Sequence, residues 1–244
     1  MKKLLFVLCL GFLFGSDLYG QLREELCEAY EDGDKKIVCF YKADGSNEEI
    51  VKKIYYYNQS AGGGKQAEVN YKNELENGLC RGWYENGQLS LEKNSKDGSE
   101  NGLWRSWYEN GQLEREGNWK DGYEDGLFRF YYENGQLRRE ENFKDGIVDS
   151  LYREYYENGQ LKREGNWKDG NEDGLFRIWD ENGQLRREEN YKDGNVNGLF
   201  RDYYENGQLR LENNYKDNKL INGKCWDEDG NELECHLLKP NSLY

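Results

Sequence analysis

Side chains that could carry out nucleophilic catalysis are scarce in this sequence. The chain contains one histidine, His236, which lies beside Cys235 close to the C-terminus. A serine or cysteine nucleophile needs a histidine base that a third group orients, so such a site would have to be built at the end of the chain. The sequence also lacks a Gly-rich phosphate loop. We therefore expect no catalytic residues, no cofactor and no enzymatic activity.

Acidic side chains are abundant, but they recur in a regular pattern. Carboxylate pairs such as Glu140 and Glu141 could in principle serve a glycosidase as acid and nucleophile. Equivalent glutamates return at fixed intervals along the chain, which is typical of strand faces exposed to solvent. These pairs are therefore interpreted as surface residues and not as a catalytic site.

One acidic stretch resembles a calcium-binding loop. The motif Asp169-x-Asn171-x-Asp173-Gly174 reproduces much of an EF-hand loop. Helices are not expected on either side, and Gly, Asn and Asp are also the residues that β-turns prefer. We interpret the motif as turn residues and predict no metal site, with weak calcium binding at turns as the alternative.

The first twenty residues form a unit of their own. Lys2 and Lys3 precede an apolar run at residues 4–14, and Leu18-Tyr19-Gly20 provides a small-residue cleavage site before Gln21. This arrangement is typical of a secretory signal peptide, and the run is too short to span a bilayer. We predict cleavage before Gln21 and export to the periplasm, the cell envelope or the medium. The alternative is that the segment stays as a short N-terminal anchor.

The remaining cysteines suit an oxidising compartment. Cys27 and Cys39 lie symmetrically around a glycine, as do Cys225 and Cys235, so each pair flanks an expected turn. We predict that each pair forms a disulfide. Cys80 occupies a position that aromatic residues fill elsewhere in the chain, so we expect a small apolar substitute and not a reactive thiol.

Charge and composition limit the class of partner. The signal segment contains two lysines and one aspartate, so its removal changes the formal net charge from −14 to −15. Nucleic acid and strongly anionic membranes are therefore poor partners. Such polarity is typical of disorder, but aromatic residues make up 15% of the chain and recur at regular spacing. This regularity indicates a repeating structure.

A tandem repeat organises the chain. The pentapeptide Glu-Asn-Gly-Gln-Leu recurs every 24 residues without insertion or deletion. A second turn signal, Lys-Asp-Gly, keeps the same spacing. Each repeat therefore contains two turns and two strands. The copies of the pentapeptide begin at Glu85, Glu109, Glu133, Glu157, Glu181 and Glu205.

The hairpin register can be predicted from one copy. Residues 127–132 and 137–143 alternate in type as strands do. A three-residue loop with Gly135 in the left-handed conformation would place Tyr131 opposite Leu137. Arg129 is then expected near Glu141. On this register one face carries the side chains that hardly vary between copies, namely Leu127, Arg129, Tyr131, Leu137, Arg139 and Phe143.

The opposite face combines aromatic side chains with a position that changes freely between copies. Positions free to vary in a repeat scaffold are available to a partner, and exposed aromatic clusters commonly anchor recognition. We therefore predict a binding surface on this face; the alternative is that the same side chains cover the concave side of the sheet itself. The predicted surface comprises Trp104, Ser106, Tyr108, Phe128, Phe130, Tyr132, Glu154, Phe176, Ile178 and Asp202.

The repeat unit resembles a known family. The pattern Leu-x-Arg-x-Trp/Tyr-Tyr-Glu-Asn-Gly-Gln-Leu, followed by Trp/Tyr-Lys-Asp-Gly, is similar to the bacterial variant of the MORN repeat over residues 70–235. The resemblance implies a row of β-hairpins in one long twisted sheet that serves protein assembly or membrane association. Some bacterial members are described as antitoxin components of toxin-antitoxin systems. The signal peptide and the −15 charge depart from a cytoplasmic antitoxin and from a binder of acidic lipids.

These observations predict an all-β, elongated antiparallel β-meander of tandem 24-residue hairpins. The expected divisions are a signal peptide at 1–20, an N-terminal β cap with degenerate repeats at 21–69, six repeats at 70–218, and a C-terminal degenerate repeat and cap at 219–244. The expected function is an exported, non-enzymatic scaffold that binds another macromolecule, a protein, through an extended β surface. The alternatives are an antitoxin or immunity-like protein that covers a toxin, and a structural protein of envelope assembly.

Overall fold

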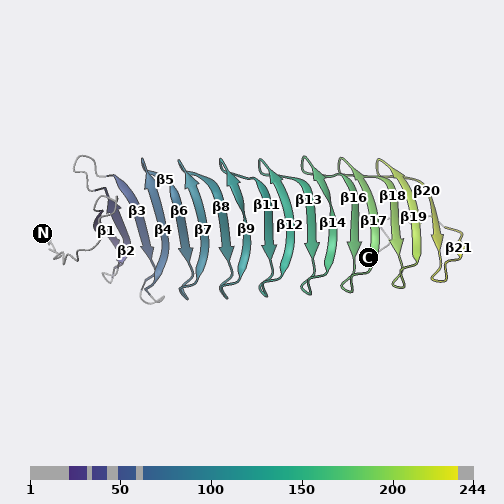
Figure 1. Ribbon diagram of the computed structural model, residues 1–244, viewed down its shortest axis with the longest axis horizontal. Helices are drawn as coiled ribbons and strands as arrows, with labels where there is room; N and C mark the ends of the chain where they lie inside the picture. The colour runs from purple at the N-terminus through teal and green to yellow at the C-terminus, as the bar shows by residue number, and fades with distance from the viewer. Residues whose placement is uncertain (1–21, 32–34, 43–48, 59–62, 236–244) are drawn as a thin grey trace, which may run out of the picture.

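The protein is a row of β-hairpins in one open sheet (Figure 1). The computed structural model describes residues 22–31, 35–42, 49–58 and 63–235. Neighbours in the sheet are also neighbours in the sequence, and all pairs are antiparallel. The predicted all-β meander is confirmed. The predicted signal peptide, Gln21 and His236 lie outside the described residues.

The first half of the sheet contains β1 (Arg23–Ala29), β2 (Lys35–Tyr41), β3 (Ile50–Tyr56), β4 (Lys65–Lys72), β5 (Leu75–Glu76), β6 (Gly78–Trp83), β7 (Leu89–Lys96), β8 (Ser99–Trp107), β9 (Leu113–Lys120) and β10 (Tyr123–Glu124). It continues with β11 (Gly126–Tyr131), β12 (Leu137–Lys144), β13 (Ile147–Tyr155), β14 (Leu161–Lys168), β15 (Asn171–Glu172), β16 (Gly174–Trp179), β17 (Leu185–Lys192), β18 (Asn195–Tyr203), β19 (Leu209–Lys216), β20 (Lys219–Trp226) and β21 (Glu232–Leu233). The two-residue strands β5, β10 and β15 pair with β4, β9 and β14, respectively. The same three partner strands also pair with β6, β11 and β16.

The Asn-Gly turns have the predicted geometry. Tyr131 lies opposite Leu137, and Gly135 adopts a φ of 83°. The Tyr132 N–H donates to the Gln136 carbonyl over 2.8 Å, which closes a three-residue loop. The left-handed conformation at its last residue is the reason that this position is glycine in each copy.

The Asp-Gly turns are tighter. Lys120 and Tyr123 are paired, so Asp121 and Gly122 form a two-residue loop with φ values of 51° and 85°. Positive φ at both central residues defines a type I′ turn, whose twist matches that of the strands it connects. Asp169 and Gly170, from the motif that resembles a calcium loop, form the equivalent turn with φ values of 49° and 78°.

The predicted assignment of side chains to faces is wrong for the second strand. Tyr131 pairs with Leu137 but Phe130 pairs with Arg139, so Arg138 is an extra residue in a β-bulge. One extra residue moves every later side chain of that strand to the other face. Arg139 and Phe143 therefore lie on the face of Phe128, opposite to the prediction. For the same reason Arg129 pairs with Glu140 and not with Glu141.

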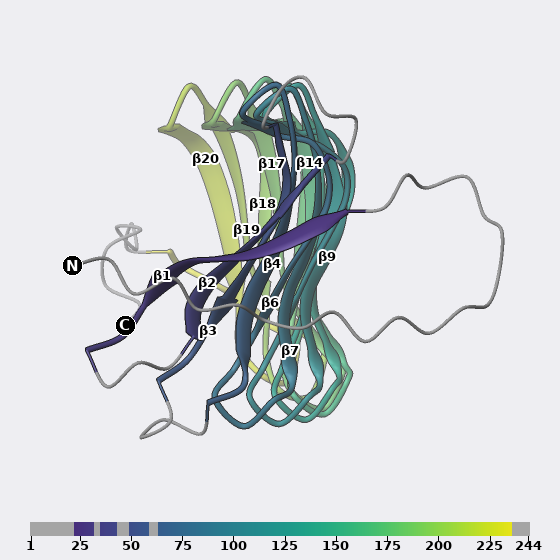
Figure 2. The same cartoon turned by 90° about the vertical axis from the view of Figure 1, so that its left-hand side faces the viewer.

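The sheet is twisted. Viewed along the array, β1 runs across the direction of β17 to β20, as Figure 2 shows. Strands of L-residues twist with a fixed hand, and the rotation accumulates over successive strands. Within the described part of the chain, no helix is long and apolar enough to cross a membrane.

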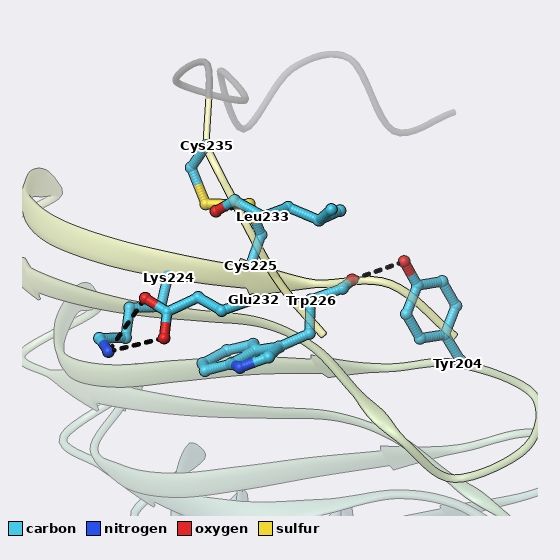
Figure 3. The surroundings of a disulfide bond; sticks show 7 residues. All are labelled: Tyr204, Lys224, Cys225, Trp226, Glu232, Leu233 and Cys235. Carbon is cyan, nitrogen blue, oxygen red and sulfur yellow. Dashed lines mark hydrogen bonds and ion pairs between the residues drawn. A yellow bond between two sulfur atoms is a disulfide. The ribbon is translucent and has the colours of Figure 1, made fainter. Parts of the chain in front are cut away.

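Disulfides lie near both ends of the array. Cys27 is bonded to Cys39 with a Cα–Cα distance of 5.9 Å, and Cys225 to Cys235 with one of 5.8 Å. The second bond links β20 to the residues after β21 (Figure 3). Cys80 is a free, buried cysteine, and burial raises the pKa of its thiol. Each disulfide ties down a terminal hairpin that has a neighbour on only one side.

Thiol counting can test this cysteine arrangement. Exported protein, denatured without reduction, should contain one free thiol, at Cys80. Peptide mapping should link Cys27 to Cys39 and Cys225 to Cys235. Five free thiols, or a link from Cys80 to either end of the chain, would contradict the structure.

A second prediction concerns a strained serine in β13. Ser150 has a φ of 73°, whereas the equivalent residues of the neighbouring repeats are glycines such as Gly126, with a φ of 87°. An L side chain in this conformation costs about 1 kcal/mol, so Ser150→Gly should raise the free energy of unfolding by about that amount. The measurement is denaturant unfolding. The matched variant Gly126→Ser should lower the free energy of unfolding by a similar amount. Backbone strain alone would cause this loss, since nothing lies within 4 Å of the position that a Cβ would take there. If both variants were as stable as the wild type, the strain would be refuted.

Candidate binding surfaces

The two faces of the sheet have different characters. We call the face that carries Phe128 and Phe130 the aromatic face. We call the face that carries Arg129 and Tyr131 the ladder face. Alternate residues of every strand belong to alternate faces, with the switch at each bulge included. The pairing of the strands therefore assigns each predicted site residue to one surface.

One row of side chains crosses the aromatic face at right angles to the strands. Phe128 and Phe176 in this row are fully buried. They lie over Gly117 and Gly165, where an added Cβ would come within 2.3 Å of each ring. The row runs through Trp104, Gly117, Phe128, Glu141, Tyr152, Gly165, Phe176, Glu189, Phe200 and Asn213. The glycines leave space for the neighbouring rings, which lets a single layer of side chains close over them.

The covering groups come from the neighbouring strands. The ring centroid of Phe128 lies 5.2 Å from that of Phe143 and 6.4 Å from that of Trp119, both edge to face. The Arg115 guanidinium lies 4.8 Å above the same ring. Full burial of one phenylalanine contributes about 2–3 kcal/mol. The row is therefore the core of a sheet that has no second layer.

Half of the predicted binding residues are buried on this face. Phe128, Phe176 and Phe130 are buried, as are Ser106 and Asp202. A partner cannot touch these side chains without displacing their neighbours, so the prediction that they present an exposed surface is wrong. The alternative, that they cover the sheet itself, describes these five residues.

The freely changing position is matched to the bulge residue of the same hairpin. Ser106 donates a hydrogen bond of 2.9 Å to Glu114, and Glu154 accepts one of 2.8 Å from Lys162. Asp202 forms an ion pair of 2.9 Å with Arg210. The variation therefore preserves polar complementarity within each of these hairpins. The sequence of a single repeat does not reveal this match, which can be recognised only once the bulge is known.

Tyr108 and Tyr132, which were also predicted to contact a partner, join one repeat to the next. The Tyr108 hydroxyl donates to the Tyr131 carbonyl over 2.7 Å, and the Tyr132 hydroxyl to the Tyr155 carbonyl over 2.8 Å. We call such a bond a tyrosine hook. Equivalent hooks are made by Tyr57, Tyr84, Tyr156 and Tyr204, the last to Trp226 as Figure 3 shows. Of the ten predicted residues, Trp104, Glu154 and Ile178 remain half-buried and without a hook.

The ladder face carries a continuous row of opposite charges. Arg129 lies between two glutamates, with an N–O distance of 3.0 Å to Glu140 and 3.7 Å to Glu116. The pattern repeats at Arg177 and Arg201. The alternating row comprises Glu68, Arg81, Glu92, Arg105, Glu116, Arg129, Glu140, Arg153, Glu164, Arg177, Glu188, Arg201 and Glu212.

Neighbouring groups on this face shift one another's pKa values. Burial pushes the pKa of Glu188 upwards, but hydrogen bonds from Arg177 and Tyr203 outweigh it, so the pKa lies below its usual value. Burial, together with Glu116, raises the pKa of Tyr131 to about 12. The Tyr131 hydroxyl donates to Glu116 over 3.1 Å. Arginines and glutamates alternate along the row, so their charges balance locally.

A second row on the ladder face is apolar. Trp107 pairs with Leu113 and Tyr131 with Leu137, and all four side chains are half-buried. Their equivalents occur in each repeat, so a strip of aromatic rings and leucines runs beside the charged ladder. The rings of the strip are Trp83, Trp107, Tyr131, Tyr155, Trp179 and Tyr203.

The constant separation of eleven residues between each Arg and the Glu that it pairs with was the signal for a charged ladder. It was missed because the bulge was missed. Within residues 22–31, 35–42, 49–58 and 63–235, no three His, Cys, Asp or Glu side chains gather closely enough to hold a metal ion.

Comparison with known proteins agrees with the hairpin repeat. The family model described as "MORN repeat variant" matches residues 76–97, 100–121, 124–145, 149–169, 172–193 and 196–217. No curated protein matches the chain. Among solved structures, a chain of "Crystal Structure of TcdB2-TccC3-Cdc42" is similar at 13% identity and a TM-score of 0.21. The match covers 86% of this chain but only 15% of that one. Six tandem matches over more than half of the sequence show that the protein belongs to the MORN repeat variant family.

Proposed function

We propose that this protein is an exported, non-enzymatic scaffold that binds another protein across its ladder face. The observation that carries the proposal is the difference between the faces. On the aromatic face Phe128, Phe130 and Phe176 are buried. The rings of the strip on the ladder face, such as Trp107, Tyr131 and Trp179, are only half-buried and form a continuous line along the array. A continuous strip of partly exposed apolar side chains on a monomer indicates an interaction surface.

The composition of the ladder face suits a protein partner. Trp, Tyr and Arg are the residues that most often dominate the binding energy at protein interfaces. The charged ladder alternates in sign, so it offers a partner register and specificity without a net attraction for polyanions. The net charge of −14 over the whole chain disfavours nucleic acid and anionic lipid in the same way.

Export is supported by the N-terminal sequence and by the two disulfides. Disulfides persist in oxidising compartments and are rare in the cytosol. The same surface could cover a toxin, which is the antitoxin-like alternative that family resemblance implies. A role in envelope assembly would instead require association of the array ends, where the disulfides lie. The identity and compartment of the captured partner distinguish these roles.

Affinity capture from the native host tests the proposal. Wild-type protein should retain a specific partner from the envelope fraction. The double variant Trp107→Ala, Trp179→Ala should retain at least tenfold less, because loss of an interface tryptophan costs about 2 kcal/mol or more. The measurement is quantitative mass spectrometry of envelope and cytoplasmic fractions processed separately.

A control variant on the aromatic face keeps the test specific. Arg138 is exposed on that face, so Arg138→Glu should capture as much partner as the wild type. Thermal unfolding of all three proteins separates lost binding from lost folding. Loss of capture with Arg138→Glu, together with normal capture by the double tryptophan variant, would place binding on the aromatic face.

A further inference from the structure

One repeat lacks the tyrosine hook. Asp180 stands where the other copies have Tyr84, Tyr108, Tyr132, Tyr156 or Tyr204. Its carboxylate accepts the N–H groups of Asn182 and Gln184, both over 3.0 Å, and so stays within its own turn. Among the described residues no side chain donates to the Tyr203 carbonyl, which is the acceptor that a tyrosine at position 180 would reach.

A hollow lies beside the place of the missing ring. It has a volume of about 190 Å³ and includes Tyr203 in its wall. Three arginines and one carboxylate face it, together with an apolar side chain. The lining residues are Ile178, Arg186, Arg187, Asp202, Tyr203 and Arg210.

The arginines of the hollow are not fully paired. Arg187 and Arg210 share the buried Asp202, with N–O distances of 2.6 Å and 2.9 Å. Arg186 is the bulge residue of its hairpin, and the freely changing position of the same hairpin holds Ile178. The side chain of Ile178 offers no hydrogen-bond acceptor to Arg186. Two nitrogens, Nη1 of Arg186 and Nε of Arg210, are buried without a hydrogen bond. Buried donors are normally satisfied, so these point to an absent acceptor.

Other unpaired guanidinium nitrogens in the array have a different environment. Those of Arg115, Arg139 and Arg163 lie over aromatic rings, at centroid distances of 4.8, 4.2 and 4.7 Å. The ring faces compensate their charge. In the described structure neither Arg186 nor Arg210 has a ring beneath it. The excess of positive charge is therefore local to this hollow.

We propose that the hollow below Asp180 binds a small oxyanion, a carboxylate or phosphate group, between Arg186 and Arg210. Planar guanidinium groups bind such oxygens through charge-assisted hydrogen bonds. The volume suffices for a group about the size of the absent phenol ring. Asp202 holds Arg187 and Arg210 in place and leaves the charge of Arg186 for the ligand. The site lies on the aromatic face and is independent of binding at the ladder face.

Thermal unfolding and calorimetry with succinate and with inorganic phosphate, each against chloride at equal ionic strength, test the site. Wild-type protein should show saturable binding of at least one of the two probes, and the tighter one identifies the ligand class. Arg186→Gln should weaken binding at least tenfold. Asp180→Tyr should abolish it, because the ring fills the hollow and restores the hook to Tyr203, while the melting temperature stays equal or rises.

A matched control relocates the hollow. Tyr84→Asp in the Asp180→Tyr background opens an equivalent space in the first repeat, where the bulge positions hold Ser90 and Glu114 in place of arginines and Ser106 is bonded to Glu114. This double variant should remain unable to bind either anion. Wild-type protein that responds to both probes as it does to chloride, or unchanged binding in Asp180→Tyr, would overturn the proposal.

Discussion

A sheet of one layer has to bury apolar surface without a second layer to pack against. Here the constraint is met by side chains that reach across strands: Phe128 lies over Gly117, with Trp119 and Phe143 at its edges and Arg115 above it. Each such ring is covered by groups from the strands before and after it. The stability of a repeat therefore depends on its neighbours, as it does in other solenoid-like arrays.

This solution gives the two faces separate tasks. The aromatic face is closed by the Phe–Gly row, by pairs such as Glu154 with Lys162, and by hooks such as that from Tyr132 to the Tyr155 carbonyl. The ladder face needs no such closure, because Arg and Glu alternate along it and balance in charge. It keeps its apolar strip half-exposed, which is why the proposed protein contact is placed there.

Much of the fold could be predicted from the sequence, because turns are local. A three-residue hairpin loop requires a left-handed residue at its last position, and Gly135 provides it. The bulge at Arg138 could not be predicted in the same way, since it depends on pairing with both neighbouring strands. Burial of Phe128 depends on Gly117, which belongs to the preceding repeat. Phe128 and Phe176 were consequently predicted to be exposed to a partner when they form the core, and the hollow at Asp180 was not foreseen.

The central claim is that Phe128 and Phe176 form a closed core on the aromatic face, while the apolar strip of the ladder face is partly exposed. Hydroxyl-radical footprinting of the folded protein measures this directly, since oxidation rates report the solvent exposure of individual aromatic side chains. Phe128 and Phe176 should be strongly protected relative to the denatured chain, whereas Trp107, Tyr131 and Trp179 should be oxidised readily. Oxidation of Phe128 and Phe176 at rates matching those of denatured protein, with protection of the tryptophans, would contradict the account.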